Sequence, residues 1–442
     1  MSTLATTLIV AALVGSPFAP RAVVPVTSPA VAVTATPSAF NPEASARASK
    51  TVIALIPSAA GTLSVDVVTA AGTIQDNLLP ATPVTVGSTT TLDWHGKGVA
   101  DGTYGIQATL VDTTGVTSQS VTAVVVDSTA PSVRLAALGS GQTAVGPVAI
   151  RATSRDATSL TRMTLTVESQ LGVVLGTLSV PVNVDGRRAA LDWNLRLRKR
   201  LLLPGAYHLR LTGVDSAGNV GRSEARVLRV DRAVKNTIVY SLREAGPVIG
   251  LAFDDCVSEQ AWLSIIRSFR AAKAHTTFFC NGVNVRSNPT AARATLAGGH
   301  TIGSHTWGHP ELPSLSRSEQ LNQLKGDKEI WWRVAKASPM PFFRPPYGLH
   351  NATTDGAAGS EGFAYSVLWD VDPSDYLTPP PGVLIDKVTQ QSRAGSIVVL
   401  HVNANTAAAV PELIRALRRR GLEPKSLDEM FGVSAYLAPR SH

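Results

Sequence analysis

Two pairs of side chains with the chemistry of a metal site occur in the C-terminal half of the 442-residue chain. His305 and His309 stand four residues apart in GSHTWGHP, and Asp254 and Asp255 are adjacent in GLAFDDC. Imidazoles at this spacing share one face of a helical turn and can bind one divalent cation, with Asp255 as a third ligand. An isolated His-x-x-x-His in a loop is more often structural than metal-binding. The other polar residues of the region therefore decide between these two interpretations.

Acid and base candidates accompany these ligands. Two adjacent buried carboxylates repel each other, which raises the pKa of one of them. A cation on Asp255 would relieve the repulsion and leave Asp254 as a general base toward a water molecule whose pKa the cation has lowered. His401, the last residue of SIVVLH, is the candidate general acid. Arg344 beside a carboxylate such as Asp372 would form a buried ion pair that orients Asp254 or His401.

The elements that must position these residues begin at Val248. Apolar strands alternate there with amphipathic stretches predicted as helices at 259–274, 316–336 and 407–420. This order predicts a parallel sheet or (β/α) barrel, in which the carboxyl ends of the strands meet at one mouth. Polar residues follow five successive strands: Asp254, Asp255, His305, His309, Arg344, Tyr347, Asp370, Asp372, Asp375 and His401.

An internal repeat precedes this region. Residues 91–115 are echoed by residues 190–219, because both contain Leu-Asp-Trp, then Gly-x-Tyr at the start of an alternating strand, then an Asp-x-x-Gly turn. The period predicts tandem domains, and the short alternating strands predict immunoglobulin-like sandwiches. The units resemble small sandwich modules of bacterial surface and flagellar-hook proteins. We expect a multidomain chain with a linker at 23–49, all-β immunoglobulin-like sandwiches at 50–128 and 129–233, and an α/β distorted (β/α) barrel at 237–433.

Charge and the N-terminus indicate where the protein works. The formal net charge of +8 favours anionic surroundings such as a cell wall, and no compact Lys/Arg run with interleaved aromatic residues indicates nucleic acid. Residues 4–15 are apolar but too few to span a bilayer, and no later segment is long enough. Residues 1–22 are predicted to be a secretory signal peptide, although no Lys or Arg precedes the apolar run. We expect a secreted or cell-wall-associated protein without a transmembrane span.

At these residues the region 237–431 resembles the polysaccharide deacetylases of carbohydrate esterase family 4, the NodB homology domain. Five motifs occur in the family's order, FDDC, SHTWGH, RPPY, DPSDY and VLH. The resemblance implies that Asp254 is the catalytic base and His401 the acid. It also implies that Asp255, His305 and His309 hold the metal.

The remaining motifs imply further roles. Arg344 would orient the base, the backbone N–H of Tyr347 would help to hold the oxyanion, and Asp372 would contact the active-site His or Arg. Tyr376 stands where Trp is commoner in the fourth motif, and Leu400 belongs to the final motif. We expect Tyr347, Tyr376 and Leu400 to contact the substrate.

Cys256 and Cys280, the two cysteines of the chain, end neighbouring predicted strands. Parallel strands lie about 5 Å apart, and a disulfide needs Cα atoms about 4.4–6.8 Å apart. A disulfide and two buried thiols are therefore both open, and a thiolate on the metal is a third option. In the family Gly-Pro usually follows the Asp pair, where this chain has Cys256 and Val257, and an Asp usually follows the final His, where it has Val402. These departures are expected to alter the loop and to remove one contact.

These residues and the resemblance together indicate metal-dependent hydrolysis of an N-acetyl group on a β-1,4-linked amino sugar polymer. Zinc is the default metal, and the ligand set also admits cobalt, nickel or manganese. Peptidoglycan is the first substrate choice, with chitin oligomers or O-acetylated xylan as alternatives. A non-catalytic glycan-binding wall protein is the rival from another class. The loop containing Arg196, Arg198, Lys199 and Arg200 is expected to contact anionic wall polymer, although a merely solvated loop fits equally well.

Overall fold

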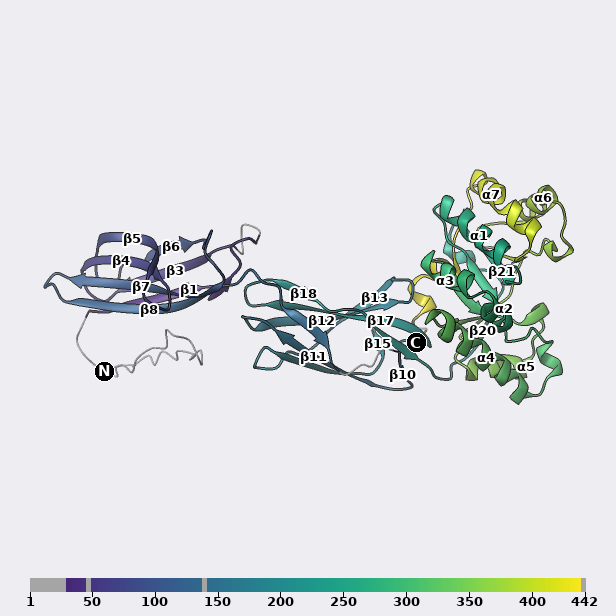
Figure 1. The fold of residues 1–442 in the computed structure, drawn as a ribbon, viewed down its shortest axis with the longest axis horizontal. Helices are drawn as coiled ribbons and strands as arrows, with labels where there is room; N and C mark the ends of the chain where they lie inside the picture. Colours follow the sequence, from purple (N-terminus) through teal and green to yellow (C-terminus); the bar gives the residue numbers. More distant parts are fainter. Residues whose placement is uncertain (1–28, 45–48, 137–140, 439–442) are drawn as a thin grey trace.

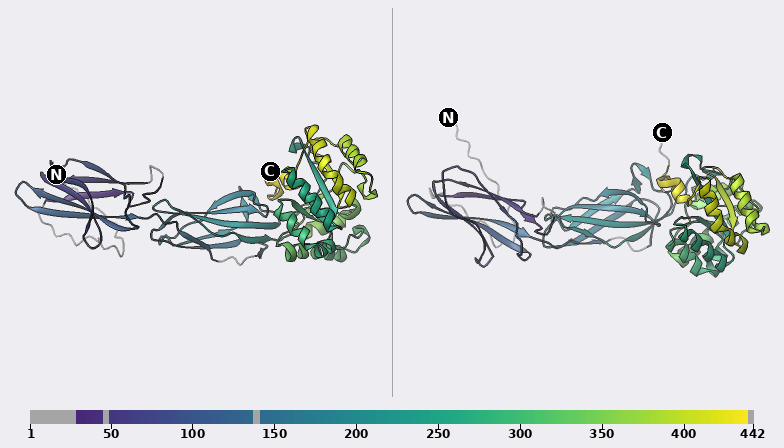
Figure 2. Two further views of the ribbon diagram at one scale, coloured as in Figure 1. Left: turned by 45° about the horizontal axis from the view of Figure 1, so that its top comes forward. Right: turned by 90° about the horizontal axis from the view of Figure 1, so that it is seen from above.

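The computed structural model describes residues 29–44, 49–136 and 141–438. Three units lie in a row, two built of strands and a third in which helices surround a sheet (Figure 1). The other two views show the same row (Figure 2). The predicted signal peptide, residues 1–22, lies outside the described residues. No helix within the described ranges combines the length and the apolar character that crossing a membrane requires.

The first unit consists of two sheets, in the strand orders β1-β3-β6 and β2-β8-β7-β4-β5. Alternate side chains of β3, β4 and β7 are buried, and the rings of Phe40 and Tyr104 pack edge-on against Trp94 in the core. The strands are β1 (Val31–Thr36), β2 (Ala39–Phe40), β3 (Thr51–Pro57), β4 (Gly61–Val68), β5 (Ile74–Val84), β6 (Thr90–Trp94), β7 (Gly102–Asp112) and β8 (Thr117–Val126).

Part of the predicted linker at 23–49 belongs to this core. β1 pairs antiparallel with β3, β2 pairs parallel with β8, and Val31 and Phe40 are buried. The linker prediction is therefore wrong for residues 31–40. The strand VAVTAT is built only from Val, Ala and Thr, so its two faces differ too little in hydrophobicity to reveal the alternation in the sequence.

The second unit repeats the two-sheet plan, with the orders β14-β11-β9 and β10-β19-β17-β12-β13, and β18 on β17. The repeated Trp and Tyr are equivalent in space. Trp94 and Trp193 each end a strand and are buried, and the hydroxyls of Tyr104 and Tyr207 each donate to the carbonyl four residues earlier. The strands are β9 (Ser132–Leu135), β10 (Gln142–Ala144), β11 (Val148–Arg155), β12 (Leu160–Ser169), β13 (Val174–Ser179), β14 (Arg188–Trp193), β15 (Arg196–Leu197), β16 (Arg200–Leu201), β17 (Gly205–Asp215), β18 (Val220–Arg222) and β19 (Arg226–Val230). The immunoglobulin-like assignment of both units stays a prediction.

The third unit is built on a curled parallel sheet in the order β20-β25-β24-β23-β22-β21-β26, with β27 on β21. A parallel bridge between Val371 and Val398 joins the segment after β25 to β26 and curls the sheet toward a barrel. The strands are β20 (Thr237–Val239), β21 (Val248–Asp255), β22 (Thr277–Cys280), β23 (Thr301–Ser304), β24 (Phe342–Phe343), β25 (Tyr365–Val367), β26 (Ile397–His401) and β27 (Glu423–Pro424). Because the strands are parallel, their carboxyl ends lie at one edge.

Helices cover this sheet, and the three predicted helical stretches correspond to α1, α4 and α7. Ser258 caps α1, and Ser316 forms a capping box with Glu319 at the start of α4. Each cap satisfies backbone N–H groups that the first turn of a helix leaves free. The helices are α1 (Glu259–Ala271), α2 (Gly282–Ser287), α3 (Pro289–Ala297), α4 (Arg317–Ala335), α5 (Ala352–Ser360), α6 (Pro381–Gln391), α7 (Ala404–Arg419) and α8 (Leu427–Phe431).

The second and third units share one hydrophobic cluster. The segment after α8 returns to the second unit, where Leu437 forms an antiparallel bridge with Leu202 and the ring of Tyr436 packs edge-on against Tyr207. Arg200 donates side-chain hydrogen bonds to the carbonyls of Leu437 and Ala438, at 2.7 and 2.6 Å. Part of the Arg196–Arg200 loop therefore serves the junction between units.

Candidate active site

Asp255, His305 and His309 converge at the carboxyl edge of the sheet. Their ligand atoms all lie within 4.8 Å of one another, and Asp255 Oδ1 is 3.6 Å from His305 Nε2 and 3.3 Å from His309 Nε2. Atoms bound to one tetrahedral cation at about 2.0–2.1 Å are about 3.3–3.4 Å apart. Asp255 Oδ1 is also buried without a hydrogen-bond partner among the described residues. A buried carboxylate oxygen aimed at two imidazoles fits a divalent cation in chemistry and in spacing.

The loop that holds the two histidines is irregular, so the prediction of a shared helical turn is wrong. Thr306 and His309 have φ values of 66° and 62°, in the left-handed region, and these reversals bring the imidazole centroids to 4.8 Å. The His309 N–H donates to Thr306 Oγ1 at 3.0 Å. His305 Nδ1 lies 2.8 Å from the carbonyl oxygen of Arg344, which leaves Nε2 turned toward Asp255.

Burial sets the protonation state of His305. Desolvation lowers its pKa to about 3, against a smaller opposing effect of Asp255. The imidazole is therefore neutral at physiological pH. A neutral imidazole is the form that binds a metal ion, so His305 needs to lose no proton to serve as a ligand.

Asp254 is held by a buried arginine. Arg344 Nη1 lies 2.7 Å from Asp254 Oδ1, and both side chains are buried. Arg344 also donates to the carbonyls of Val367 and Leu368, so its position is fixed by three partners. Burial raises the pKa of Asp254, while the charges of Arg344 and His401 oppose the rise. Asp254 Oδ2 points instead toward His305, 3.9 Å from Nε2, which suits a base at the edge of the cation site.

His401 faces the same edge from the end of β26 and is held by Asp375. Its Nδ1 lies 2.7 Å from Asp375 Oδ1, and its backbone N–H donates to Asp375 Oδ2. Thr406 donates to the same Oδ2 at 2.6 Å. Burial lowers the pKa of His401, but the hydrogen bond to Asp375 and the charges of Asp254 and Asp375 outweigh it and raise the pKa to about 9. His401 therefore carries a proton at neutral pH.

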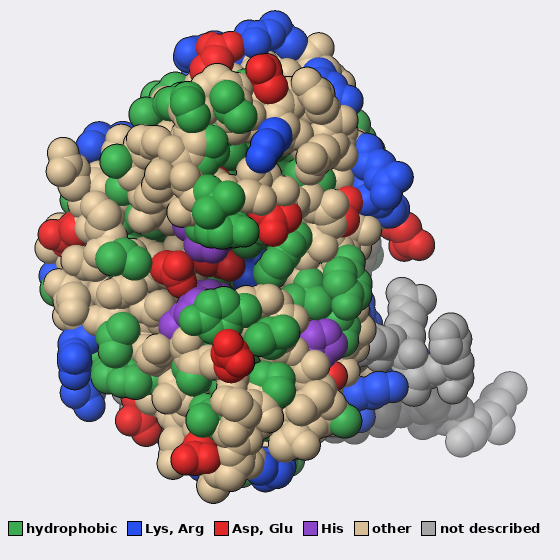
Figure 3. Space-filling view, turned by 90° about the vertical axis from the view of Figure 1, so that its right-hand side faces the viewer, with side chains coloured by type: hydrophobic (Ala, Val, Ile, Leu, Met, Phe, Trp, Pro, Cys, Tyr) green, Lys and Arg blue, Asp and Glu red, His purple; other side chains and the backbone are tan. Residues whose placement is uncertain are grey.

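These groups open onto the end of the molecule remote from the first two units. In Figure 3 histidine and acidic side chains gather in a hollow in the middle of that face, with apolar side chains above and below. Tyr347 and Tyr376 are 60% and 57% exposed. Their rings lie 4.6 Å from the His309 ring and 5.8 Å from the His401 ring, so each tyrosine flanks one functional histidine.

Comparison with known proteins assigns this unit to a family. Residues 242–366 match the family model described as polysaccharide deacetylase. The C-terminal domain belongs to the polysaccharide deacetylase family. The matched stretch contains Asp254, Asp255, His305, His309 and Arg344.

Relatives of the deacetylase domain share part of this chain. The peptidoglycan-N-acetylglucosamine deacetylase PgdA of Listeria monocytogenes is 31% identical over 185 residues, which are 42% of this chain and 39% of the relative. The peptidoglycan-N-acetylmuramic acid deacetylase PdaC of Bacillus subtilis is 30% identical over 184 residues, 41% of this chain and 38% of the relative. A peptidoglycan-N-acetylglucosamine deacetylase of Bacillus cereus is 27% identical over 211 residues, 46% of this chain and 98% of the relative. The chain therefore spans about two fifths of the length of the first two.

One predicted role in the deacetylase domain falls to a different residue. Asp372 is exposed, and its Oδ1 accepts from the N–H of Ser374 within a local turn. Asp375 is buried and contacts His401, and the carboxylate paired with Arg344 is Asp254. The prediction for Asp372 is therefore wrong. DPSDY offers two carboxylates three residues apart, and only the path of the loop decides which of them turns inward.

Leu400 is likewise placed away from the surface of the hollow. Its side chain is buried in the hydrophobic cluster of the deacetylase domain, and its backbone is paired with Phe253 in the neighbouring strand. In a strand, successive side chains point to opposite faces, so Leu400 and the adjacent His401 face different surroundings. The burial of the Leu400 side chain does not support the predicted contact with substrate.

The two cysteines form a disulfide beside the cation site. Cys256 and Cys280 are bonded, with Cα atoms 5.1 Å apart. Cys256 directly follows Asp255, and the register of β21 and β22 sets Asp255 opposite Cys280. Of the options that the sequence leaves open, the described structure contains the disulfide, and both sulfur atoms are therefore withdrawn from metal binding.

Proposed function

We propose that the deacetylase domain hydrolyses N-acetyl groups on amino sugars of a cell-wall polysaccharide, peptidoglycan first, and releases acetate. The observation that carries the proposal is the meeting of three metal-ligand side chains with a buried base, Asp254, and a protonated imidazole, His401, at one hollow. A carboxylate base beside a protonated imidazole suits a reaction that takes one proton and gives another. The similarity to three peptidoglycan deacetylases supports peptidoglycan as the first choice of substrate.

Each residue has a separate task in this mechanism. A divalent cation held by Asp255, His305 and His309, with zinc as our choice, would act as a Lewis acid toward the acetyl carbonyl. Asp254 takes a proton from the attacking water on Oδ2, since Arg344 occupies Oδ1. The backbone N–H of Tyr347 stabilises the developing negative oxygen.

The leaving group needs a proton, and His401 supplies it. Asp375 binds Nδ1, which leaves the Nε2 proton for the departing amine. Collapse of the tetrahedral intermediate breaks the carbon–nitrogen bond and yields acetate and a free amino sugar. Afterwards Asp254 carries the proton from water and His401 has lost one, so exchange with solvent restores both groups.

The decisive experiment separates the base from the cation site. Asp254→Asn in the full chain should abolish acetate release from purified peptidoglycan, because the amide cannot accept the proton. The same variant should retain the bound divalent metal measured by elemental analysis, since Asp255, His305 and His309 are intact. Full acetate release by the variant would refute the assigned base. Parallel assays on acetylated xylan and chitin oligomers distinguish the substrates.

Export and wall association belong to the same proposal. The predicted signal peptide at 1–22, the substrate and the two all-β units together favour a secreted or wall-bound enzyme. The all-β units would act as immunoglobulin-like spacers or attachment modules that hold the catalytic hollow at the far end of the molecule. The exposed members of the Arg196–Arg200 loop are one candidate contact with anionic polymer.

A further inference from the structure

The positive charge of the protein is concentrated in its second unit. Residues 129–233 contain 15 Lys and Arg against 7 Asp and Glu, a net charge of +8 that equals that of the whole chain. Residues 29–128 contain 3 basic against 7 acidic residues, a net charge of −4. Neighbouring units of the same architecture thus carry opposite charge, so the excess on the second unit does not follow from its fold.

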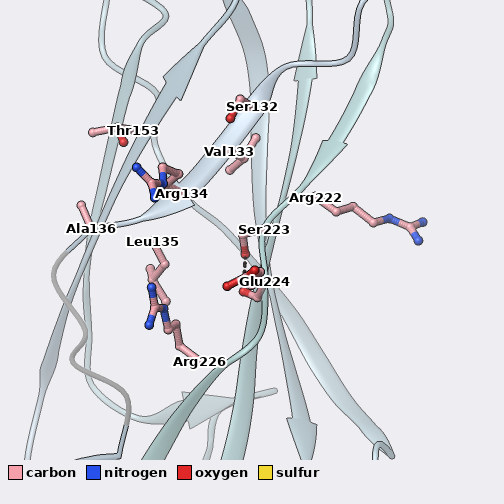
Figure 4. A pocket seen from close by; sticks show the side chains of 10 residues that line it. All are labelled: Ser132, Val133, Arg134, Leu135, Ala136, Thr153, Arg222, Ser223, Glu224 and Arg226. Carbon is pink, nitrogen blue, oxygen red and sulfur yellow. Dashed lines mark hydrogen bonds between the residues drawn. The ribbon is translucent and has the colours of Figure 1, made fainter.

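A groove of about 470 Å³ runs along one edge of this unit, between β9 and the segment from β18 to β19 (Figure 4). β9 pairs with β11 on one side only, and β18 pairs with β17 on one side only, so two strand edges border the groove. Arg134, Arg222 and Arg226 line it together with Ser132, Thr153 and Glu224. In Figure 4 Arg226 extends toward Leu135 and Arg134, whereas Arg222 extends to the opposite side.

The strand register extends the basic groove onto the adjoining sheet face. Arg134, Thr153 and Arg188 are partners across β9, β11 and β14, and all three are exposed. Arg155 lies opposite Ser132, two positions further along β11, and is exposed on the same face. Side chains in one row or two positions apart along a strand share a face. The groove and this face therefore form a continuous basic surface.

The arginines that line the groove have no counter-charge among the described residues. On the same sheet face, Arg151 pairs with Asp192 at 2.9 Å and Arg188 with Asp185 at 2.8 Å, so these two arginines are already partly neutralised. Arg134, Arg155, Arg222 and Arg226 form no ion pair and no side-chain hydrogen bond with any residue in the described ranges. Glu224, the acidic side chain that lines the groove, is exposed and likewise forms no ion pair with a described residue. The groove thus offers guanidinium donors that no described residue engages.

We propose that this groove, lined by Arg134 and Arg226, binds a polyanionic chain that bears phosphate or carboxylate groups. Guanidinium groups match both oxyanions through paired N–H donors, and the hydroxyls of Ser132 and Thr153 add neutral donors. No aromatic side chain is among the lining residues, so the base stacking that single-stranded nucleic acid needs is lacking. Because the groove lies in the second unit and the catalytic hollow at the far end of the third, a bound polymer would tether the enzyme without blocking its substrate site.

The test compares two double variants of the full chain with equal loss of charge. Arg134→Gln with Arg226→Gln removes the groove donors, and Arg162→Gln with Arg187→Gln removes two exposed arginines of the same unit that have no ion pair among the described residues. Binding is measured by fluorescence anisotropy with labelled poly(glycerol phosphate), polygalacturonate and a DNA duplex, at low and at high salt.

The proposal predicts binding of the phosphate or the carboxylate polymer at low salt, weakened by about tenfold in the groove variant and by less than about twofold in the control. The polymer that binds more tightly identifies the source of the anionic groups. Equal weakening in both variants, tighter binding of the DNA duplex, or no binding of either polymer would overturn it. Thermal unfolding checks the fold: both double variants should unfold with the same midpoint temperature as the wild type.

Discussion

At the scale of single residues, two adjacent carboxylates acquire different chemistry from their neighbours. Asp254 is paired with Arg344, whereas Asp255 Oδ1 faces two imidazoles without a hydrogen-bond partner among the described residues. Successive side chains of a strand point to opposite faces, yet both carboxylates reach His305, at 3.9 and 3.6 Å. The side chain of Asp255 reaches His305 because its φ of 67° departs from strand geometry at the end of β21.

Asp375 gives a prediction at this scale. Asp375→Asn should lower the pKa of His401, because the variant loses the negative charge that raises it to about 9. A group with a raised pKa gives up its proton at lower pH when the cause is removed, so the alkaline limb of kcat/KM should move to lower pH. The rate at neutral pH should fall by at least about tenfold, since the general acid is less well oriented. The profile of kcat/KM from neutral to strongly alkaline pH measures both effects.

Asp372→Asn is the matched control for this experiment. The residue lies in the same loop, but it is exposed and its carboxylate contacts only the local backbone of Ser374. Its pH profile should coincide with that of the wild type. A shift in this variant and none in Asp375→Asn would reverse the assignment of the partner of His401.

At the scale of elements, the carboxyl ends of the parallel strands bring the site residues together, and the disulfide links two of these strands. The ends of β21 and β22 carry Cys256 and Cys280, which lie 24 positions apart in sequence. The loop that the disulfide closes contains all of α1, and residue 256 is adjacent to Asp255, a proposed metal ligand. The bond therefore constrains both the unfolded chain and the turn that aims Asp255.

Replacing both cysteines with serine should reduce the free energy of unfolding by about 3 kcal/mol, from the entropy of closing a loop of this length. Denaturant unfolding of the wild type and of the double variant measures the loss. A reducing agent should lower the stability of the wild type toward that of the variant and should leave the variant unchanged. Equal stability of oxidised and reduced wild type would contradict a structural role for the bond.

At the scale of the whole molecule, the second unit and the deacetylase domain are joined by a shared hydrophobic cluster. Their junction combines the Tyr207–Tyr436 contact with the ion pairs of Lys328 to Asp231 and Glu361, at 3.4 and 3.0 Å. Lys328 is almost fully buried, so loss of its acidic partners would leave a buried charge without compensation. The catalytic hollow is thereby held at the end of the row remote from the N-terminal unit.

Arg200 tests this junction. Arg200→Gln should destabilise the protein by about 1–2 kcal/mol, because the carbonyls of Leu437 and Ala438 lose charge-assisted hydrogen bonds. The exposed Arg198 is the control in the same loop, and Arg198→Gln should leave the unfolding midpoint within error of the wild type. Thermal unfolding compares the two. The junction account fails if the Arg198 variant is the more destabilised.

The sequence by itself determined the order of strands and helices in the third unit and the positions of its ionisable residues at strand ends. These follow from local patterns, since burial on both faces of a parallel strand leaves an apolar run that any reader can locate. The same holds for the repeated Trp and Tyr of the first two units, where the same residues in the same order predicted equal structure.

Only the tertiary structure decided which carboxylate of DPSDY turns inward, how His305 and His309 meet without a helix, and that residues 31–40 form strands. Each depends on groups distant in sequence. Asp375 is held inward by hydrogen bonds with His401 and Thr406, and β1 forms by pairing with β3. Such contacts leave no periodic signal in the chain, because a turn residue or a weakly apolar strand gains its conformation from the surface on which it packs.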